Sequence, residues 1–204
     1  MGEPAIVAMG ELDRVEAALA GGAVVAIPTD TVYGLAARLD RPEAVAAVFA
    51  AKGRPPGLAL PVLIGRWSQA ARVAGRLPRT ARLLAARFWP GALTVVVPAL
   101  PEVGPLLGGD GRSVGLRQPD HPFVRALCRR VGPVACTSAN PHGEPPCATA
   151  AEVVRAFSSD QVELVVDGGR CEGEPSTVVD CTATPPVCVR AGRVPWSWVE
   201  AGLR

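Results

Sequence analysis

Short apolar runs that alternate with amphipathic segments are the feature that most restricts what this chain can fold into. Runs such as 23–28 (AVVAIP), 93–97 (LTVVV) and 134–137 (VACT) have the length and apolar character of buried strands. Segments with helical spacing separate them, including 12–19 and 121–132. The alternation predicts a single α/β domain over residues 1–204, with a mixed sheet, flanking helices and no second domain.

Other segments complete this outline. Residues 66–74 and 78–88 are predicted to be helices, whereas the Gly- and Pro-rich residues 98–112 are expected to form a surface loop. Further strands are predicted at 60–64, 113–117, 163–166, 177–180 and 187–190. Because no internal repeat is present, the prediction is one sheet rather than a repeat array.

Composition excludes several classes of protein. Of the 204 residues, 49% are hydrophobic and 20% are charged, which is typical of a globular domain rather than a disordered tail or a coiled coil. No apolar run approaches the roughly 20 residues that span a bilayer, and the first residues do not resemble a signal peptide. We therefore expect a cytoplasmic protein with reduced cysteines and no membrane partner. With two histidines and no C-x-x-C pair, we expect no metal ion held by the protein itself.

Charge is unevenly distributed although the net charge is only +2. Residues 44–101, here called the basic segment, contain eight cationic side chains and no acid. These cations either form solvated helix faces or receive a polyanion, which would be nucleotide phosphates or RNA. The chain has twenty arginines but a single lysine, Lys52, which either remains by chance or marks a position that requires a compact ammonium group; we favour the second interpretation.

Polar residues gather at the ends of predicted strands. Residues 28–34 (PTDTVYG) follow the first strand and 137–140 (TSAN) follow another, and ligands of open α/β sheets collect at such edges. We favour ligand contact for the first cluster over simple capping of a turn. Arg117 and Arg190 each end an apolar strand, where a charged side chain either lies at the rim of the sheet or faces an anion.

Residues 52–56 (KGRPP) place two cations around a glycine at a helix end. They either interact with the helix dipole or clamp a phosphate. Thr149 begins a capping box and so has a structural role without any ligand. The G-x-S-x-G match at 111–115 is rejected as a nucleophile elbow because an extended segment follows the serine. Without a nucleophile, the inventory indicates binding and electrostatic stabilisation rather than covalent catalysis.

The motifs PTDTVYGL, KGRP, SVGLRQPDHP, TSAN, PSTVVD and VRAGRV occur in this order. Together they make the chain resemble the YrdC-like threonylcarbamoyl-adenylate synthases, most strongly over residues 21–194. The resemblance implies a twisted mixed α/β sheet with a concave basic cavity. It also implies a nucleotidyltransferase that makes threonylcarbamoyl-AMP and pyrophosphate from L-threonine, bicarbonate (or CO2) and ATP with Mg2+. A separate transferase complex would then modify tRNA, and direct tRNA contact is left open.

The resemblance also assigns residues to the two substrates. The positions that match the threonine site are Thr31, Arg117, Ser138 and Ser176. The positions that match the ATP site are Tyr33, Lys52, Arg54, Ser113, Asn140, Thr149 and Arg190. Lys52 and Arg54 would be the catalytic cations. Leu58, Leu63 and Pro175 depart from the family pattern, because many relatives have Asn, His and Glu there.

Two other functions compete with this one. A double-stranded RNA or tRNA-binding module in RNA or ribosome maturation would use the basic segment, but it leaves the polar strand ends unexplained. A carbamoyl-adenylate-forming relative, as in hydrogenase-maturation proteins, is disfavoured because the acylphosphatase and zinc-finger segments of those proteins are absent from this sequence.

Overall fold

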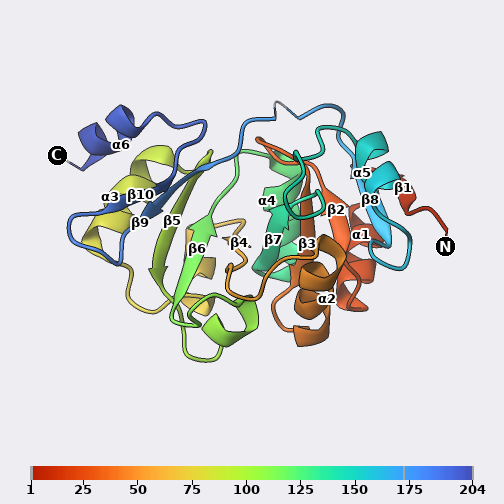
Figure 1. Cartoon of the computed structure of the whole chain (residues 1–204), viewed down its shortest axis with the longest axis horizontal. Coiled ribbons are helices and arrows are strands. Elements are labelled where there is room, and N and C mark those ends of the chain that lie inside the picture. Colours follow the sequence, from red (N-terminus) through yellow and green to blue (C-terminus); the bar gives the residue numbers. More distant parts are fainter. Residues whose placement is uncertain (1, 172, 204) are drawn as a thin grey trace.

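The computed structural model describes residues 2–171 and 173–203. These residues form one ten-stranded mixed sheet in the order β1-β8-β2-β3-β7-β4-β6-β5-β9-β10 (Figure 1). The strands are β1 (Ala5–Ala8), β2 (Val25–Ile27), β3 (Gly34–Arg38), β4 (Val62–Leu63), β5 (Leu93–Pro98), β6 (Ser113–Arg117), β7 (Val134–Ser138), β8 (Leu164–Asp167), β9 (Thr177–Asp180) and β10 (Val187–Arg190). The predicted α/β fold with a mixed sheet is confirmed.

Helices cover the sheet on its outer surfaces. They are α1 (Leu12–Ala20), α2 (Pro42–Lys52), α3 (Arg79–Phe88), α4 (Pro122–Val131), α5 (Ala150–Ala156) and α6 (Trp196–Gly202), with short 3-10 helices η1 (Trp67–Arg72) and η2 (Gly104–Leu107). Val15 of α1 and Leu127 of α4 pack together with Ile27 of β2 in one apolar cluster. A second cluster joins α2, α3 and α5 to the opposite face. Both clusters fix the strands whose ends carry the polar motifs.

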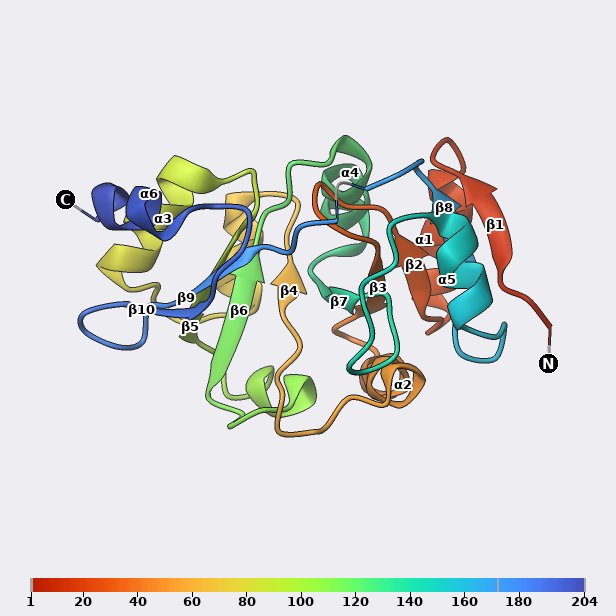
Figure 2. The same ribbon diagram turned by 45° about the horizontal axis from the view of Figure 1, so that its top comes forward.

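The path of the chain brings distant segments to the middle of the molecule. β8 pairs with β1 and β2, whereas β9 pairs with β5 and β10. The chain therefore leaves β8 in one half of the sheet and enters β9 in the other half, as Figure 2 shows. The segments that follow β2, β6, β7 and β8 carry the polar motifs of the sequence. These segments meet between the two halves of the sheet. None of the helices in the described ranges combines the length and apolar character that a bilayer-spanning helix needs.

Side chains of β5, β6 and β9 alternate between the core and an open face. Val95 of β5, Leu116 of β6 and Val179 of β9 are fully buried in the larger apolar cluster. Their neighbours Thr94 and Gly115 face the other side and line a cavity. Because successive residues of a strand point to opposite faces, these strands hold the fold with one set of residues and offer a ligand surface with the other.

Several sequence predictions are wrong in detail. Residues 66–74 form only the 3-10 helix η1, and the helical path ends there because Ala74 forms an antiparallel bridge with Ala99. Residues 98–112 are not wholly a surface loop, since Val103 and Leu107 of that segment are buried in the larger apolar cluster. The predicted strand at 60–64 is reduced to the two residues of β4. Three elements, β1, β3 and α6, were not predicted from the sequence.

Candidate active site

A cavity of about 250 Å³, here called the central cavity, lies where the ends of several strands meet. Its wall comes from the loop between β2 and β3, the end of β6, the end of β7 and the residues before β9. The lining residues are Thr29, Thr31, Val32, Tyr33, Gly34, Arg54, Pro61, Leu63, Thr94, Arg117, Cys136, Thr137, Ser138, Asn140, Glu144, Pro146, Pro175, Ser176 and Arg190. Most of the predicted threonine and ATP residues are therefore in one place.

A second cavity of about 560 Å³, the sheet cavity, adjoins the first over the open face of β5, β6 and β9. The two cavities share Arg54, Pro61, Thr94, Ser176 and Arg190. Gly115 forms part of the floor, and a Cβ atom there would lie 3.1 Å from Cγ2 of Thr94. The absence of a side chain at this position keeps the floor open for a ligand.

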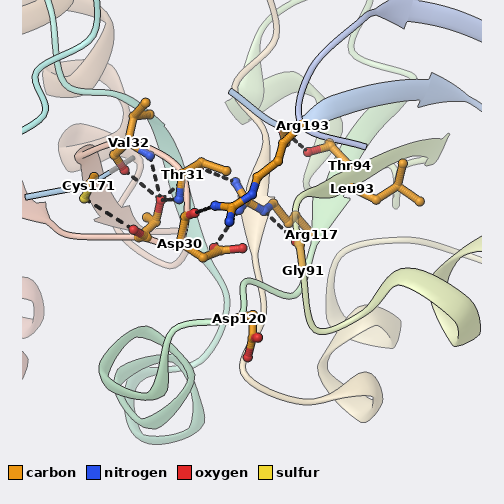
Figure 3. Close-up of polar contacts among 12 residues, drawn as sticks. Asp30, Thr31, Val32, Gly91, Leu93, Thr94, Arg117, Asp120, Cys171 and Arg193 are labelled. Carbon is orange, nitrogen blue, oxygen red and sulfur yellow. Dashed lines mark hydrogen bonds and ion pairs between the residues drawn. The ribbon is translucent and has the colours of Figure 1, made fainter. Parts of the chain in front are cut away.

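Arg117, at the end of β6, is the best-anchored cation of the central cavity. Its Nη2 donates to Oδ1 of Asp30 at 2.6 Å, Nη1 donates to the Thr31 hydroxyl at 2.9 Å, and Nε donates to the Gly91 carbonyl (Figure 3). The Asp30–Arg117 pair is nearly buried, with side-chain exposures of 13% and 7%. Within the described residues, these three contacts use three of the five guanidinium N–H groups, so the fork can still bind a carboxylate.

The loop between β2 and β3 holds the hydroxyls beside Arg117 in place. Oγ1 of Thr29 donates to the Val32 carbonyl and accepts from the backbone N–H groups of Thr31 and Val32. The hydroxyls of Thr29 and Thr31 lie 2.9 Å apart. The sequence left turn capping and ligand contact as alternatives for this cluster. In the structure Thr29 caps the turn, while Thr31 faces the central cavity.

Lys52 lies behind the wall of the cavity rather than in it. Its Nζ donates to the carbonyls of Ser138 and Asn140 and to Oδ1 of Asn140, each at 2.8 Å, with the Ser138 hydroxyl at 3.3 Å. The residue ends α2, and the left-handed conformation of Gly53 terminates the helix there. Burial, and then the charge of Arg54, lowers the pKa of Lys52 to about 8. The lone lysine is thus a fixed cation that fastens the TSAN loop to the helix end.

Arg54 and Arg190 add positive charge where the two cavities join. Arg54 donates to the carbonyls of Leu58 and Ala59, and Arg190 donates to the carbonyl and hydroxyl of Ser176. Burial lowers the pKa of both guanidinium groups, and neighbouring arginines add to the shift. These contacts hold the two cationic side chains in place before any ligand enters.

The remaining predicted residues differ in how close they come to the cavities. Ser113 lines the sheet cavity and donates to Asp110. The phenol of Tyr33 donates to the Gly169 carbonyl and accepts from the Gly168 N–H, and the residue is fully buried. Thr149 lines neither cavity and accepts from the Glu152 N–H as the N-cap of α5.

Some residues that line the two cavities were not predicted from the sequence. Thr94 bonds the Ser176 hydroxyl at 2.9 Å, and a threonine within an apolar strand was the available signal. Asp30 was noted as part of a motif, but its pairing with Arg117 joins residues 87 positions apart. Leu63 is buried at the central cavity, which Pro175 also lines, and Leu58 is 45% exposed at the sheet cavity, so all three departures from the family pattern face a ligand space.

The side chains of the two cavities can neutralise the charge of anionic substrates. Cys136 is the one thiol of the central-cavity lining given above, and burial raises its pKa to about 12, so it is not a thiolate nucleophile. Across the described residues, no three His, Cys, Asp or Glu side chains gather closely enough to hold a metal ion. Fixed cations, hydroxyls and an amide can bind and align anionic substrates.

Comparison with known proteins agrees with this arrangement. The family model for Sua5, YciO and YrdC, described as "Telomere recombination", matches residues 17–192. A protein of Bacillus subtilis named threonylcarbamoyl-AMP synthase is 39% identical over 194 residues, which is 94% of this chain and 56% of that protein. A Mycobacterium tuberculosis protein named putative threonylcarbamoyl-AMP synthase is 41% identical over 87% of this chain and 82% of its own length. The chain therefore spans just over half of the Bacillus relative but most of the mycobacterial one.

Solved structures of similar proteins have the same fold as this chain. The structure of Pyrococcus abyssi Sua5 complexed with L-threonine superposes with a TM-score of 0.90 at 34% identity, covering 99% of this chain and 60% of that one. Escherichia coli YciO shares the fold, with a TM-score of 0.84 and 24% identity. On the match of the family model, the shared fold and the convergence of the motif residues on one cavity, this chain belongs to the Sua5/YciO/YrdC family.

Proposed function

We propose that this protein condenses L-threonine, bicarbonate and ATP into threonylcarbamoyl-AMP and pyrophosphate. The observation that carries the proposal is the Arg117–Thr31 contact in a cavity that also holds Arg54 and Arg190. A guanidinium fork beside a hydroxyl suits an amino acid with a carboxylate and a side-chain hydroxyl. The relatives that carry the name threonylcarbamoyl-AMP synthase support the same reaction.

The proposed chemistry has two steps. In the first, the free amine of threonine reacts with bicarbonate to give the N-carboxylate (carbamate) and water. In the second, a carbamate oxygen attacks the α-phosphorus of ATP, and the bond to the β-phosphate oxygen breaks to release pyrophosphate. Neither step requires a covalent bond to the protein. The enzyme has to align three anions and offset their repulsion, which preorganised cations and donors accomplish.

We assign the amino acid to the central cavity and the nucleotide to the sheet cavity. Arg117, Thr31, Ser138 and Ser176 would hold threonine, and Arg54 and Arg190 would lie between the two substrates, where the phosphates meet the carbamate. The apolar stretch of the sheet cavity, with Val96, Val178 and Val189, suits a purine ring. Lys52 would act from behind the wall by fixing Asn140.

Mg2+ would enter with ATP rather than reside in the protein. Magnesium typically keeps several waters and binds one or two carboxylates together with substrate phosphates. Asp110 and Asp180 line the sheet cavity and can serve as such ligands, although Oδ1 of each already accepts hydrogen bonds from its own loop. When bound, the ion would neutralise charge on the phosphates.

The product would pass to a separate transferase complex that modifies tRNA. Threonylcarbamoyl-AMP is a mixed anhydride and therefore a group donor that water can destroy, so a receiving enzyme must act promptly. Cytoplasmic location and any direct tRNA contact, which the cations of the basic segment would supply, belong to the same proposal.

Pyrophosphate release tests the proposal. The protein is incubated with ATP, Mg2+ and bicarbonate, and each amino acid is added in turn. We expect strong release with threonine, weak release with serine and little or none with the other amino acids. Release without any amino acid, or equal release with unrelated amino acids, would contradict the assignment. A protein that lacked this activity but bound double-stranded RNA with a steep salt dependence would favour the binding-module alternative.

A further inference from the structure

Three adjacent strands contribute side chains to one wall of the central cavity. β4 lies between β6 and β7 in the sheet (Figure 1). Leu63 of β4 is paired with Arg117 of β6 on one side and with Val134 of β7 on the other. Directly paired residues point to the same face of a sheet and side chains alternate along each strand, so Cys136 and Ser138 also lie on this face. The register therefore places Leu63 and Cys136 between Arg117 and Ser138.

Leu63 and Cys136, here called the apolar floor, are buried side chains of this face that line the cavity. They are 5% and 6% exposed, and both also belong to the apolar cluster of α1 and α4. Gly34 of β3 leaves room for the thiol, since a Cβ atom there would lie 2.5 Å from Sγ of Cys136. The apolar floor is therefore supported by packed side chains on its far side.

The thiol of the apolar floor is uncharged. Burial raises the pKa of Cys136 to about 12, and the positive charges of Arg117 and Lys52 oppose this shift only in part. A neutral thiol behaves as a small hydrophobic group. The interaction with the charge of Arg117 agrees with the strand register, which places both residues on one face. The floor thus offers apolar contact beside a cation that can bind a carboxylate.

The polar groups beside the floor leave one substituent of threonine to be placed. Arg117 suits the carboxylate of an amino acid, and the Thr31 hydroxyl, 2.9 Å from Nη1 of Arg117, suits its side-chain hydroxyl. With these two groups bound, the methyl group is the remaining heavy substituent of Cβ, and contact with an apolar surface stabilises it. Because Leu63 is the direct strand partner of Arg117, the apolar floor lies beside the bound carboxylate.

We propose that the apolar floor receives the methyl group of the amino acid, and that Leu63 and Cys136 are specificity-determining residues for threonine over serine. This inference rests on the proposed function, because it concerns the amino acid of that reaction. It goes further by assigning the methyl group, and with it the configuration at Cβ, to two side chains outside the predicted threonine site. Leu63 is one of three residues that depart from the family pattern, so the floor distinguishes this chain from many relatives.

The natural sequence provides the first test. L-Threonine, L-serine and L-allo-threonine are titrated calorimetrically into the protein without ATP or bicarbonate. In L-allo-threonine the hydroxyl and methyl groups exchange places on Cβ. We expect the Kd for threonine to be about fivefold lower than that for serine, the ratio expected for burial of one methyl group. The Kd for allo-threonine should be at least as high as that for serine. Serine or allo-threonine binding as tightly as threonine, or no binding of threonine, would overturn the proposal.

Two variants test the residues of the floor. Cys136→Ser places a hydroxyl in the floor and Leu63→Ala removes much of its apolar surface, so each should bring the Kd values for threonine and serine to within about twofold of each other. The matched controls should keep the fivefold ratio. They are Cys188→Ser, at a cysteine of β10 that is not among the lining residues of either cavity, and Leu19→Ala, at a fully buried leucine of the same cluster. If both folded variants keep the natural ratio, the proposal is wrong.

Leu63→Ala should also gain a ligand. The smaller side chain leaves space for the threonine homologue that has an ethyl group in place of the methyl, so this variant should bind the homologue more tightly than the natural sequence does. Loss of stability alone would not produce that gain, and its absence would show that Leu63 does not contact the substituent. The first titration decides the proposal even if a variant does not fold. Binding in the expected order without pyrophosphate release would refute the proposed function but not the floor, whereas release with equal binding of threonine and serine would do the reverse.

Discussion

Replacing Lys52 by arginine should damage the protein although the charge is retained. The ammonium group donates to the carbonyl of Ser138 and to both oxygens of Asn140 at 2.8 Å, so its three N–H groups converge on two adjacent residues. A planar guanidinium is larger and cannot direct its donors to the same three oxygens. The residue is 4% exposed, so the extra volume cannot move into solvent.

The size of the effect follows from these contacts. One buried oxygen left without a donor costs about 1–3 kcal/mol, and inserting a bulkier side chain into a packed site costs about 1–3 kcal/mol. We expect the free energy of unfolding to fall by about 3 kcal/mol, which for a chain of this length lowers Tm by about 6–12 °C. Turnover should fall roughly ten- to a hundredfold, because Asn140 and Ser138 would no longer be fixed beside the substrates.

Calorimetry and pyrophosphate release measure these two quantities. Arg76→Lys, the reverse exchange at an exposed position, serves as the matched control and should change neither. A Lys52→Arg protein with an unchanged Tm and full turnover would refute the reasoning that the lysine is required as a compact donor. A reduced Tm with full turnover would show that the lysine serves the fold alone.

Four other outcomes are expected. Arg117→Ala should raise the KM for threonine far more than the KM for ATP. It should also lower the free energy of unfolding by about 3 kcal/mol, because Asp30 loses its buried partner. Adding Asp30→Asn should recover part of that stability but should not restore the KM for threonine. Because Lys52 loses its proton as the pH rises through about 8, kcat/KM for ATP should fall above that pH, and Lys52→Arg should lack this alkaline decline. Gly115→Val should raise the KM for ATP and spare that for threonine, since its side chain would enter the sheet cavity near Thr94. Adenylate formation at matched amino-acid concentrations should follow the order threonine, serine, then valine. Buried hydroxyls of the protein left without a partner cost about 1–3 kcal/mol each, whereas the burial of one methyl group is worth about 1 kcal/mol. Equal adenylate formation with valine and serine would contradict a pocket that recognises the hydroxyl.

Local pattern was enough to identify most of the strands and the polar residues at their ends. The runs at 93–97 and 134–137 became β5 and β7 because apolar residues of that length can only be buried in a sheet or core. Arg117 and Arg190 could be singled out because a charge that ends an apolar strand needs a partner. The capping role of Thr149 was also readable, since an N-cap is formed by residues close together in the chain.

Tertiary structure decided what depends on contacts between distant residues. The 3-10 helix η1 is shorter than the helix expected at 66–74 because Ala74 forms a bridge with Ala99, a residue of another segment. Sequence could indicate that Lys52 was unusual, but only the fold showed that its partners lie 86 and 88 residues away and that it stands behind the wall. The central cavity is of the same kind, because its wall comes from segments far apart in the chain that meet only after the two halves of the sheet have assembled.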